Sequence, residues 1–126
     1  MNVALDIDGT ITAKPEFFAV LSKAIRANGG KVIIVTSRSN TTEVKAQTRR
    51  ELRGYGIAFD ELVVIADAAG DRLPCPHGDL DWYQQYLWQK VAVCVERGVT
   101  IIFEDDEKVI ALFKRFAPDV QVFQLM

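Results

Sequence analysis

The stretch that decides the fold is Val3-Ala4-Leu5-Asp6-Ile7-Asp8-Gly9-Thr10. Its first three residues are apolar and predict a short buried β-strand. The Asp8-Gly9 pair predicts that a turn ends this strand, because glycine adopts backbone conformations that other residues resist. A buried strand that ends in two acidic residues indicates that Asp6 and Asp8 belong to a functional site.

The rest of the chain alternates between helical and strand patterns. We expect helices over residues 15–27, 41–55, 80–97 and about 109–116. We expect strands over 31–36, 61–66, 99–103 and 120–123, and a loop rich in Gly, Pro and Asp from 67 to 81. This order predicts an α/β fold: a three-layer α/β/α, Rossmann-like domain with a parallel five-stranded sheet over residues 1–126.

The composition narrows the classes of protein to consider. A chain of 126 residues with 49% hydrophobic content can build one core without metals or disulfides. Its 15 basic and 17 acidic residues give a net charge of −2, so no overall positive field attracts nucleic acid or lipid. No apolar run is long enough to span a membrane, and we expect a soluble, cytoplasmic protein in which Cys75 and Cys94 are reduced thiols.

Reactive side chains follow three of the predicted strands. The first strand delivers Asp6 and Asp8, the second delivers residues 36–38 (Thr-Ser-Arg), and the fourth delivers residues 104–106 (Glu-Asp-Asp). Ligands of open α/β sheets bind beyond the carboxyl ends of the strands, so these groups should share one rim. Asp6 and Asp8 are two residues apart and should point to the same side, where one can act as nucleophile and the other can transfer protons.

The rim has the composition of a magnesium and phosphate site. Carboxylates of Asp6, Asp8 and Asp105 would form the oxygen cluster that Mg²⁺ prefers, with Glu104 or Asp106 as the alternatives to Asp105. The groups expected to bind a substrate phosphate are hydroxyls, backbone N–H groups and a guanidinium fork, from Gly9, Thr10, Thr36, Ser37 and Arg38. Lys90 could reach the same rim and offset its negative charge, with Lys14 and Lys108 as alternatives.

Together these motifs resemble the haloacid dehalogenase superfamily of aspartyl-phosphate phosphohydrolases. That family has an Asp-x-Asp-Gly-Thr motif, a Thr or Ser after the second strand, a Lys, and an acidic motif after the fourth strand. The resemblance implies Mg²⁺-dependent phosphomonoester hydrolysis, with these roles: nucleophile Asp6, general acid and then base Asp8, phosphate ligand Thr36, charge stabiliser Lys90, and metal ligand Asp105. It also implies that the backbone carbonyl of Asp8 binds the metal. The segments that carry cap domains in many members are short here, so we expect an open site.

Residues 35–38, the Arg-rich helix after them, and residues 88–90 look most like the phosphatase half of bacteriophage-type polynucleotide kinase, although no kinase P-loop is present. This likeness leaves the phosphorylated substrate open between a small molecule and a nucleic-acid end. The alternatives are a phosphotransferase and a module of the same fold that binds phosphate or nucleic-acid ends without turnover. The sequence does not indicate an oligomeric state.

Three further groups of residues have simpler explanations. Lys45, Arg49 and Arg53 form a basic stripe that could follow a nucleic-acid backbone, but an ordinary solvated helix face is favoured. A cluster of aromatic residues could stack on a base, but a core or subunit-interface role is favoured for Trp82, Tyr83, Tyr86 and Trp88. Cys75 and His77 lack the second ligand pair of a zinc site and are interpreted as loop residues.

Overall fold

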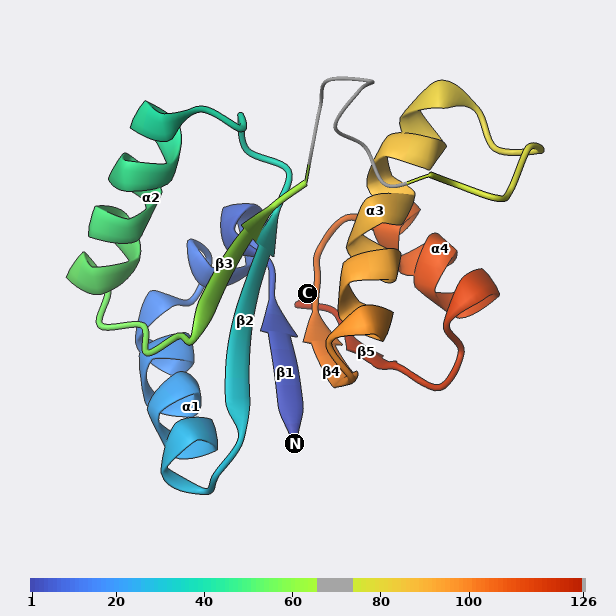
Figure 1. The fold of residues 1–126 in the computed structure, drawn as a ribbon. Helices are drawn as coiled ribbons and strands as arrows, with labels where there is room; N and C mark the ends of the chain where they lie inside the picture. The colour runs from blue at the N-terminus through green and yellow to red at the C-terminus, as the bar shows by residue number, and fades with distance from the viewer. Residues whose placement is uncertain (66–73, 126) are drawn as a thin grey trace.

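The computed structural model describes residues 1–65 and 74–125, and its elements are arranged around one sheet (Figure 1). The strands are β1 (Asn2–Leu5), β2 (Lys31–Thr36), β3 (Glu61–Val64), β4 (Val99–Phe103) and β5 (Gln121–Phe123). The longer helices are α1 (Pro15–Ala27), α2 (Thr42–Gly54), α3 (Trp82–Glu96) and α4 (Glu107–Phe116). A short kinked helical segment, η1 (Ile7–Ile11), follows β1.

All strand pairs are parallel, and the order across the sheet is β3-β2-β1-β4-β5. The chain order therefore reverses at β1, which lies in the centre with β2 on one side and β4 on the other. A ligand site is expected at such a reversal, beyond the carboxyl ends of the central strands. The sheet order therefore predicts a ligand site at the carboxyl end of β1.

Two hydrophobic layers cover the two faces of the sheet. Val3, Leu5, Val32 and Ile34 pack in one cluster with buried residues of α1 and α2. Ala4, Ile33, Val35 and Ile102 pack in the other cluster with buried residues of α3 and α4. Figure 1 shows the two helix pairs on opposite sides of the sheet. The three-layer, Rossmann-like α/β fold is therefore confirmed, and β1 and β2 are buried on both faces as their unbroken apolar runs predict.

Helix and strand boundaries agree with the prediction to within a few residues. Pro15 is the first residue of α1, and Thr41 caps α2 by accepting a hydrogen bond from the backbone N–H of Val44 at 3.2 Å. Asp81 and Gln84 form a reciprocal capping box at the start of α3. The third strand ends at Val64 rather than continuing to residue 66, and residues 66–73 of the predicted loop lie outside the described residues.

The four aromatic residues at 82–88 divide into two pairs. Tyr86 is buried and Trp88 packs against the core, which confirms the core interpretation for these two. Trp82 and Tyr83, on the first turn of α3, are exposed, which excludes a core role for them in this chain, whereas the subunit-interface role stays a prediction. His77 lies in a loop, as expected, and its ring stacks on that of Phe116 with centroids 3.9 Å apart.

Two other sequence-based expectations concern cysteine chemistry and the membrane. Cys75 and Cys94 are both free thiols. Within the described residues, none of the helices combines the length and apolar character that crossing a bilayer requires.

Phe18 provides a direct test of the core between α1 and the sheet. Its side chain is fully buried, and its ring lies edge-on to that of Phe103 with centroids 5.4 Å apart. We expect Phe18→Ala to lower the free energy of unfolding by about 3–5 kcal/mol, because it removes buried apolar surface and leaves a cavity. Urea denaturation would measure this change.

The matched control is Val20→Ala on the same helix. Val20 is 71% exposed, so its truncation should change the free energy of unfolding by less than about 0.5 kcal/mol. Equal losses for the two variants would contradict the assigned orientation of α1.

Candidate active site

Asp6 is positioned by the central strand and by the turn that follows it. Its backbone N–H donates to the carbonyl of Phe103 on β4 at 3.0 Å, which continues the parallel pairing one residue beyond β1. The chain then turns at Gly9, whose φ is +82°. The turn brings the Thr10 hydroxyl back to donate a hydrogen bond to Asp6 Oδ2 at 3.1 Å. Asp6 is therefore held by both backbone and side-chain contacts.

A buried lysine joins the acids of β1 and β4. Lys90 on α3 places Nζ 3.0 Å from Asp6 Oδ1 and 3.0 Å from Glu104 Oε2. The exposed fractions of the three side chains are only 3%, 8% and 1%, respectively, so water screens these charges weakly. Lys90 is thus the candidate lysine that reaches Asp6, whereas the ammonium of Lys108 lies over the ring of Tyr83.

The environment of this triad shifts the pKa values of its members. Burial raises the pKa of Asp6 above its ordinary value, and Lys90 only partly opposes that rise. Burial alone would lower the pKa of Lys90, but the nearby carboxylates of Asp6 and Glu104 outweigh burial and raise it. The ammonium therefore stays protonated, and it provides the positive charge that two close carboxylates need.

Gly9 allows Asp105 to approach the β1 turn closely. A Cβ atom built at Gly9 would collide with the Asp105 carboxylate. The Thr10 hydroxyl lies 3.1 Å from Asp6 Oδ2 and 3.4 Å from Asp105 Oδ1, so it links the two acids. Carboxylate oxygens of Asp6, Glu104 and Asp105 all lie within 4.8 Å of one another.

The three consecutive acids after β4 have different partners. Glu104 contacts Lys90 through one oxygen and accepts from the backbone N–H of Asp106 through the other, at 3.2 Å. Asp106 caps α4 by accepting from the backbone N–H of Lys108 at 2.8 Å. Asp105 has the Thr10 hydroxyl 3.4 Å from its Oδ1, and its carboxylate also interacts with that of Asp6, which contributes to the raised pKa of Asp6.

Asp8 lies on the outer side of the site and pairs with Arg38. The guanidinium donates from Nε to Asp8 Oδ2 at 3.0 Å and from Nη2 to Oδ1 at 2.8 Å. These bonds hold the pKa of Asp8 below its ordinary value. The opposite edge of Arg38 contacts Glu51 on α2, with Nη1 2.7 Å from Oε2, and this lowers the pKa of Glu51 as well.

The end of β2 shapes the remaining wall. Thr36 is buried, and its hydroxyl accepts from the backbone N–H of Arg38 at 3.2 Å. The hydroxyl of Tyr86 donates to the carbonyl of Ser37 at 3.1 Å, which fixes this segment against α3. A pocket of about 170 Å³ lies between these elements and is lined by Asp6, Asp8, Ser37, Leu87, Lys90, Glu104, Asp105, Asp106 and Val109.

The sequence-based site residues therefore come together at one rim, but they occupy different positions in it. Asp6, Asp8, Ser37, Lys90 and Asp105 line the pocket. In the described part of the chain, the other predicted phosphate ligands are not among the residues that line the pocket: Gly9, Thr10, Thr36 and Arg38.

Two partners were missed by sequence reasoning. From the sequence, Glu104 is considered only as a metal ligand, although it pairs with Lys90, and no role is assigned to Glu51. The helical spacing of Glu51 could have indicated that it borders the buried face of α2, because Glu51 follows Thr48 by three residues and directly precedes Leu52. Thr48 and Leu52 are both buried, so Glu51 borders the inner face of α2.

The fold has solved relatives, although sequence comparison finds none. No protein-family model and no curated protein sequence matches the chain. A chain in a structure of the Pnkp1/Rnl/Hen1 RNA repair complex superposes with a TM-score of 0.68 at 20% identity, over 98% of this chain and 42% of that chain. A chain in a second structure of the Pnkp1/Rnl/Hen1 complex gives 0.64 at 21% identity, over 98% and 45%. At this identity the likeness concerns the fold, and the present chain spans less than half the length of either neighbour.

Gly9→Ala tests the close approach of Asp105. Gly29 has nearly the same φ, +83° against +82°, but a Cβ there would meet no atom within 4 Å. We expect Gly29→Ala to lower the free energy of unfolding by about 1–2 kcal/mol through backbone strain alone. Gly9→Ala should cost more because Asp105 must also move. Urea denaturation of both variants would measure the difference, and equal costs would show that Asp105 does not pack against Gly9.

Proposed function

We propose that this protein is a Mg²⁺-dependent phosphomonoester hydrolase that works through an aspartyl-phosphate on Asp6. The observation that supports this most is the buried contact of Lys90 with Asp6 beside Asp105. An anionic carboxylate can approach an anionic phosphate only if nearby positive charge reduces their repulsion. Lys90 provides one such charge, and it is held at 3.0 Å from Asp6.

The donor set fits a magnesium ion. Asp6 and Asp105 offer hard carboxylate oxygens within the 4.8 Å cluster, and the missing Cβ of Gly9 leaves room for Asp105. Mg²⁺ is commonly bound by one or two carboxylates together with waters and a substrate phosphate. The protein ligands would be Asp6, Asp105 and the backbone carbonyl of Asp8. When bound, the ion would polarise a phosphoryl oxygen and neutralise developing charge.

The side chains supply a two-step reaction. Asp8 must first take up a proton, which the negative charge of an arriving phosphate favours and the pairing with Arg38 opposes. An oxygen of Asp6 then attacks phosphorus in line, the P–O bond to the leaving group breaks, and Asp8 donates its proton to the departing oxygen. In the second step Asp8 removes a proton from water, which attacks the phosphorus. The P–O bond to Asp6 then breaks, so phosphate is released and the Asp6 carboxylate is restored. Thr36, Ser37 and the β1 turn are the proposed ligands of the phosphate.

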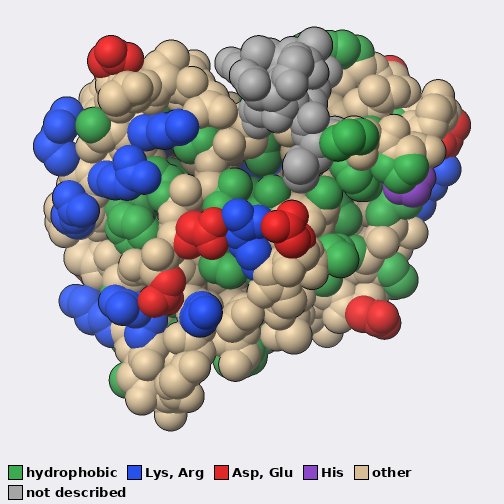
Figure 2. All heavy atoms as spheres, viewed as in Figure 1, with side chains coloured by type: hydrophobic (Ala, Val, Ile, Leu, Met, Phe, Trp, Pro, Cys, Tyr) green, Lys and Arg blue, Asp and Glu red, His purple; other side chains and the backbone are tan. Residues whose placement is uncertain are grey.

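End phosphates of nucleic acids are the first substrates to test. The two solved neighbours come from an RNA repair complex, which gives this class priority over sugar phosphates and nucleotides. Figure 2 shows Lys and Arg side chains gathered over the α2 and α1 side of the molecule. Arg49 and Arg53 of the basic stripe are exposed there, while Lys45 is half-buried, so part of this surface could contact a strand.

Two other functions share the fold. A phosphotransferase would pass the phosphoryl group from Asp6 to an acceptor other than water, and a binding module would retain phosphate without turnover. Hydrolysis is favoured because the nucleophile, the acid/base and the metal-binding group are all present in one pocket that admits water. Release of inorganic phosphate distinguishes it from both alternatives.

Asp6→Asn tests the nucleophile. We expect Mg²⁺-dependent release of phosphate from an aryl phosphate and from a 3′-phosphorylated oligonucleotide to fall by at least about a thousandfold, because an amide cannot form the acyl phosphate. Asp79→Asn is the matched control, since it removes the same charge from a residue paired with Arg115 outside the pocket, and it should retain full activity. If the wild-type protein released no phosphate across both substrate types, the hydrolase proposal would fail.

Asp105→Asn tests the metal ligand. Losing one carboxylate should weaken Mg²⁺ binding by at least about tenfold, as measured by calorimetric titration of the protein without substrate. Asp106→Asn is the control, because asparagine also caps helices well and should preserve both stability and Mg²⁺ affinity. The reverse result, with weak binding only in the Asp106 variant, would assign the metal ligand to Asp106.

A further inference from the structure

Among residues 1–65 and 74–125, one side chain, that of Arg38, hydrogen-bonds the carboxylate of the proposed acid/base Asp8. Its own side chain is 64% exposed, so packing contributes little to its orientation. The two bonds from Arg38, at 3.0 and 2.8 Å, form a parallel fork on both carboxylate oxygens. Such a fork fixes the plane of a carboxylate as well as its position. The orientation of Asp8 therefore depends on where the guanidinium of Arg38 is held.

Side chains of α2 hold Arg38 in place. Its Nη1 donates to Glu51 Oε2 at 2.7 Å and to the hydroxyl of Thr48 at 3.2 Å, and its Nη2 lies 3.4 Å from Glu51 Oε1. Glu51 also accepts from the hydroxyl of Tyr55 at 3.3 Å. Thr48 is almost fully buried, so this part of α2 is fixed against the core. A continuous path of contacts thus runs from α2 through Arg38 to Asp8.

The donor count shows what Arg38 can bind. A guanidinium has five N–H groups. Arg38 makes two bonds to Asp8, two to Glu51 and one to Thr48. Every donor is therefore directed at a protein side chain. Arg38 could bind a substrate phosphate through its fork only by releasing one of the two carboxylates.

We propose that Glu51 is a positioning residue, which holds Arg38 so that Arg38 orients Asp8 instead of binding the substrate phosphate. This inference rests on the proposed function, since it assigns a support to the acid/base of that reaction. It differs from the role expected from the sequence, in which Arg38 is a phosphate ligand. The two roles affect different quantities: orientation of Asp8 affects turnover, whereas a phosphate ligand affects affinity for phosphate.

The test uses Glu51→Gln, which keeps the size of the side chain and removes its charge. With an aryl phosphate and Mg²⁺, kcat should fall roughly tenfold, because even a small displacement of a reacting group is costly to rate. The inhibition constant of inorganic phosphate should stay within about twofold of the wild-type value, because phosphate binding does not use Arg38. Thermal unfolding of the same samples confirms that the variant is folded.

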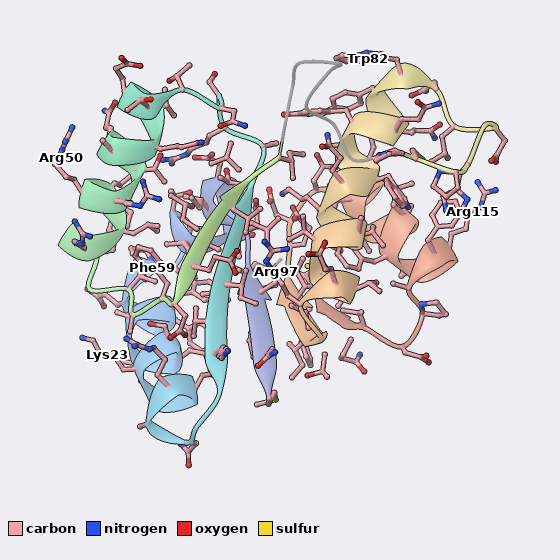
Figure 3. All side chains as sticks on the ribbon, in the orientation of Figure 1. Lys23, Arg50, Phe59, Trp82, Arg97 and Arg115 are labelled. Carbon is pink, nitrogen blue, oxygen red and sulfur yellow. The ribbon has the colours of Figure 1, made fainter. Side chains whose placement is uncertain are left out.

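The matched control is Glu61→Gln. Glu61 on β3 binds Arg97 with contacts of 2.9 and 2.7 Å, a comparable pair at the end of the sheet opposite the site. Arg97, at the end of α3, is labelled in Figure 3. This control changes the net charge equally and should leave kcat and phosphate inhibition unchanged. Arg38→Lys is a second variant of the path: it keeps the positive charge, cannot bridge two carboxylates, and should also lower kcat.

A double-mutant cycle identifies the residue through which Glu51 acts. In an Asp8→Asn background, adding Glu51→Gln should cause no further loss of the residual activity. The inference is overturned if phosphate inhibition weakens in parallel with the loss of activity, if the loss persists in the Asp8→Asn background, or if a folded Glu51→Gln protein has normal kcat. Each of these outcomes leaves wild-type hydrolysis intact, so it is distinguishable from failure of the proposed function.

Discussion

The site depends on one buried ammonium group between two carboxylates. Without Lys90, the charges of Asp6 and Glu104 would face each other in a region with little water, and at least one of them would take up a proton. Lys90 opposes the rise that burial causes in the pKa of Asp6, and so favours the anionic form of the carboxylate that lines the pocket. The same contacts join α3 to the ends of β1 and β4, so this one cation both supports the proposed nucleophile and fixes α3 against the sheet.

The segments that follow β1 and β2 position the other charged groups of the site. The turn after β1 brings Asp8 to the outer side of the pocket and leaves room at Gly9 for Asp105. The segment after β2 carries Arg38, which is engaged by Asp8 on one edge and by Glu51 on the other. Lys90 thus neutralises Asp6 and Glu104, and Arg38 neutralises Asp8 and Glu51. These pairs explain how several carboxylates can lie close together at the rim.

Much of this arrangement could be predicted from the sequence, for identifiable reasons. The apolar runs of β1 and β2 have no alternation, α1 begins at a proline, and Thr41 and Asp81 cap α2 and α3, so the three layers follow from local patterns. Asp6 and Asp8 were identifiable because a short motif places them at the end of a buried strand. Lys90 could be identified only because its long side chain can reach the rim from α3, since a lysine within a helix carries no local sequence signal.

Contacts between distant segments could not be predicted in the same way. Glu51 is surrounded in sequence by charged residues of α2, and nothing local indicates that it meets Arg38 across 13 residues. The pairing of Glu104 with Lys90 depends on the inward orientation of α3, which the sequence leaves undetermined. Tyr86 and Trp88 were correctly expected in the core, whereas Trp82 and Tyr83, on the first turn of α3, are exposed.

The central place of β1 has a consequence for motion. Its residues bond to strands on both sides and are packed on both faces, so backbone amides there should exchange with deuterium only through the rarest openings of the molecule. Arg38, in contrast, lies in a connecting segment where local fluctuation is cheaper. Asp6, the proposed nucleophile, directly follows β1 and thus forms a fixed reference point, and the contacts of Arg38 with Asp8 and Glu51 offset this local mobility on the other side of the site.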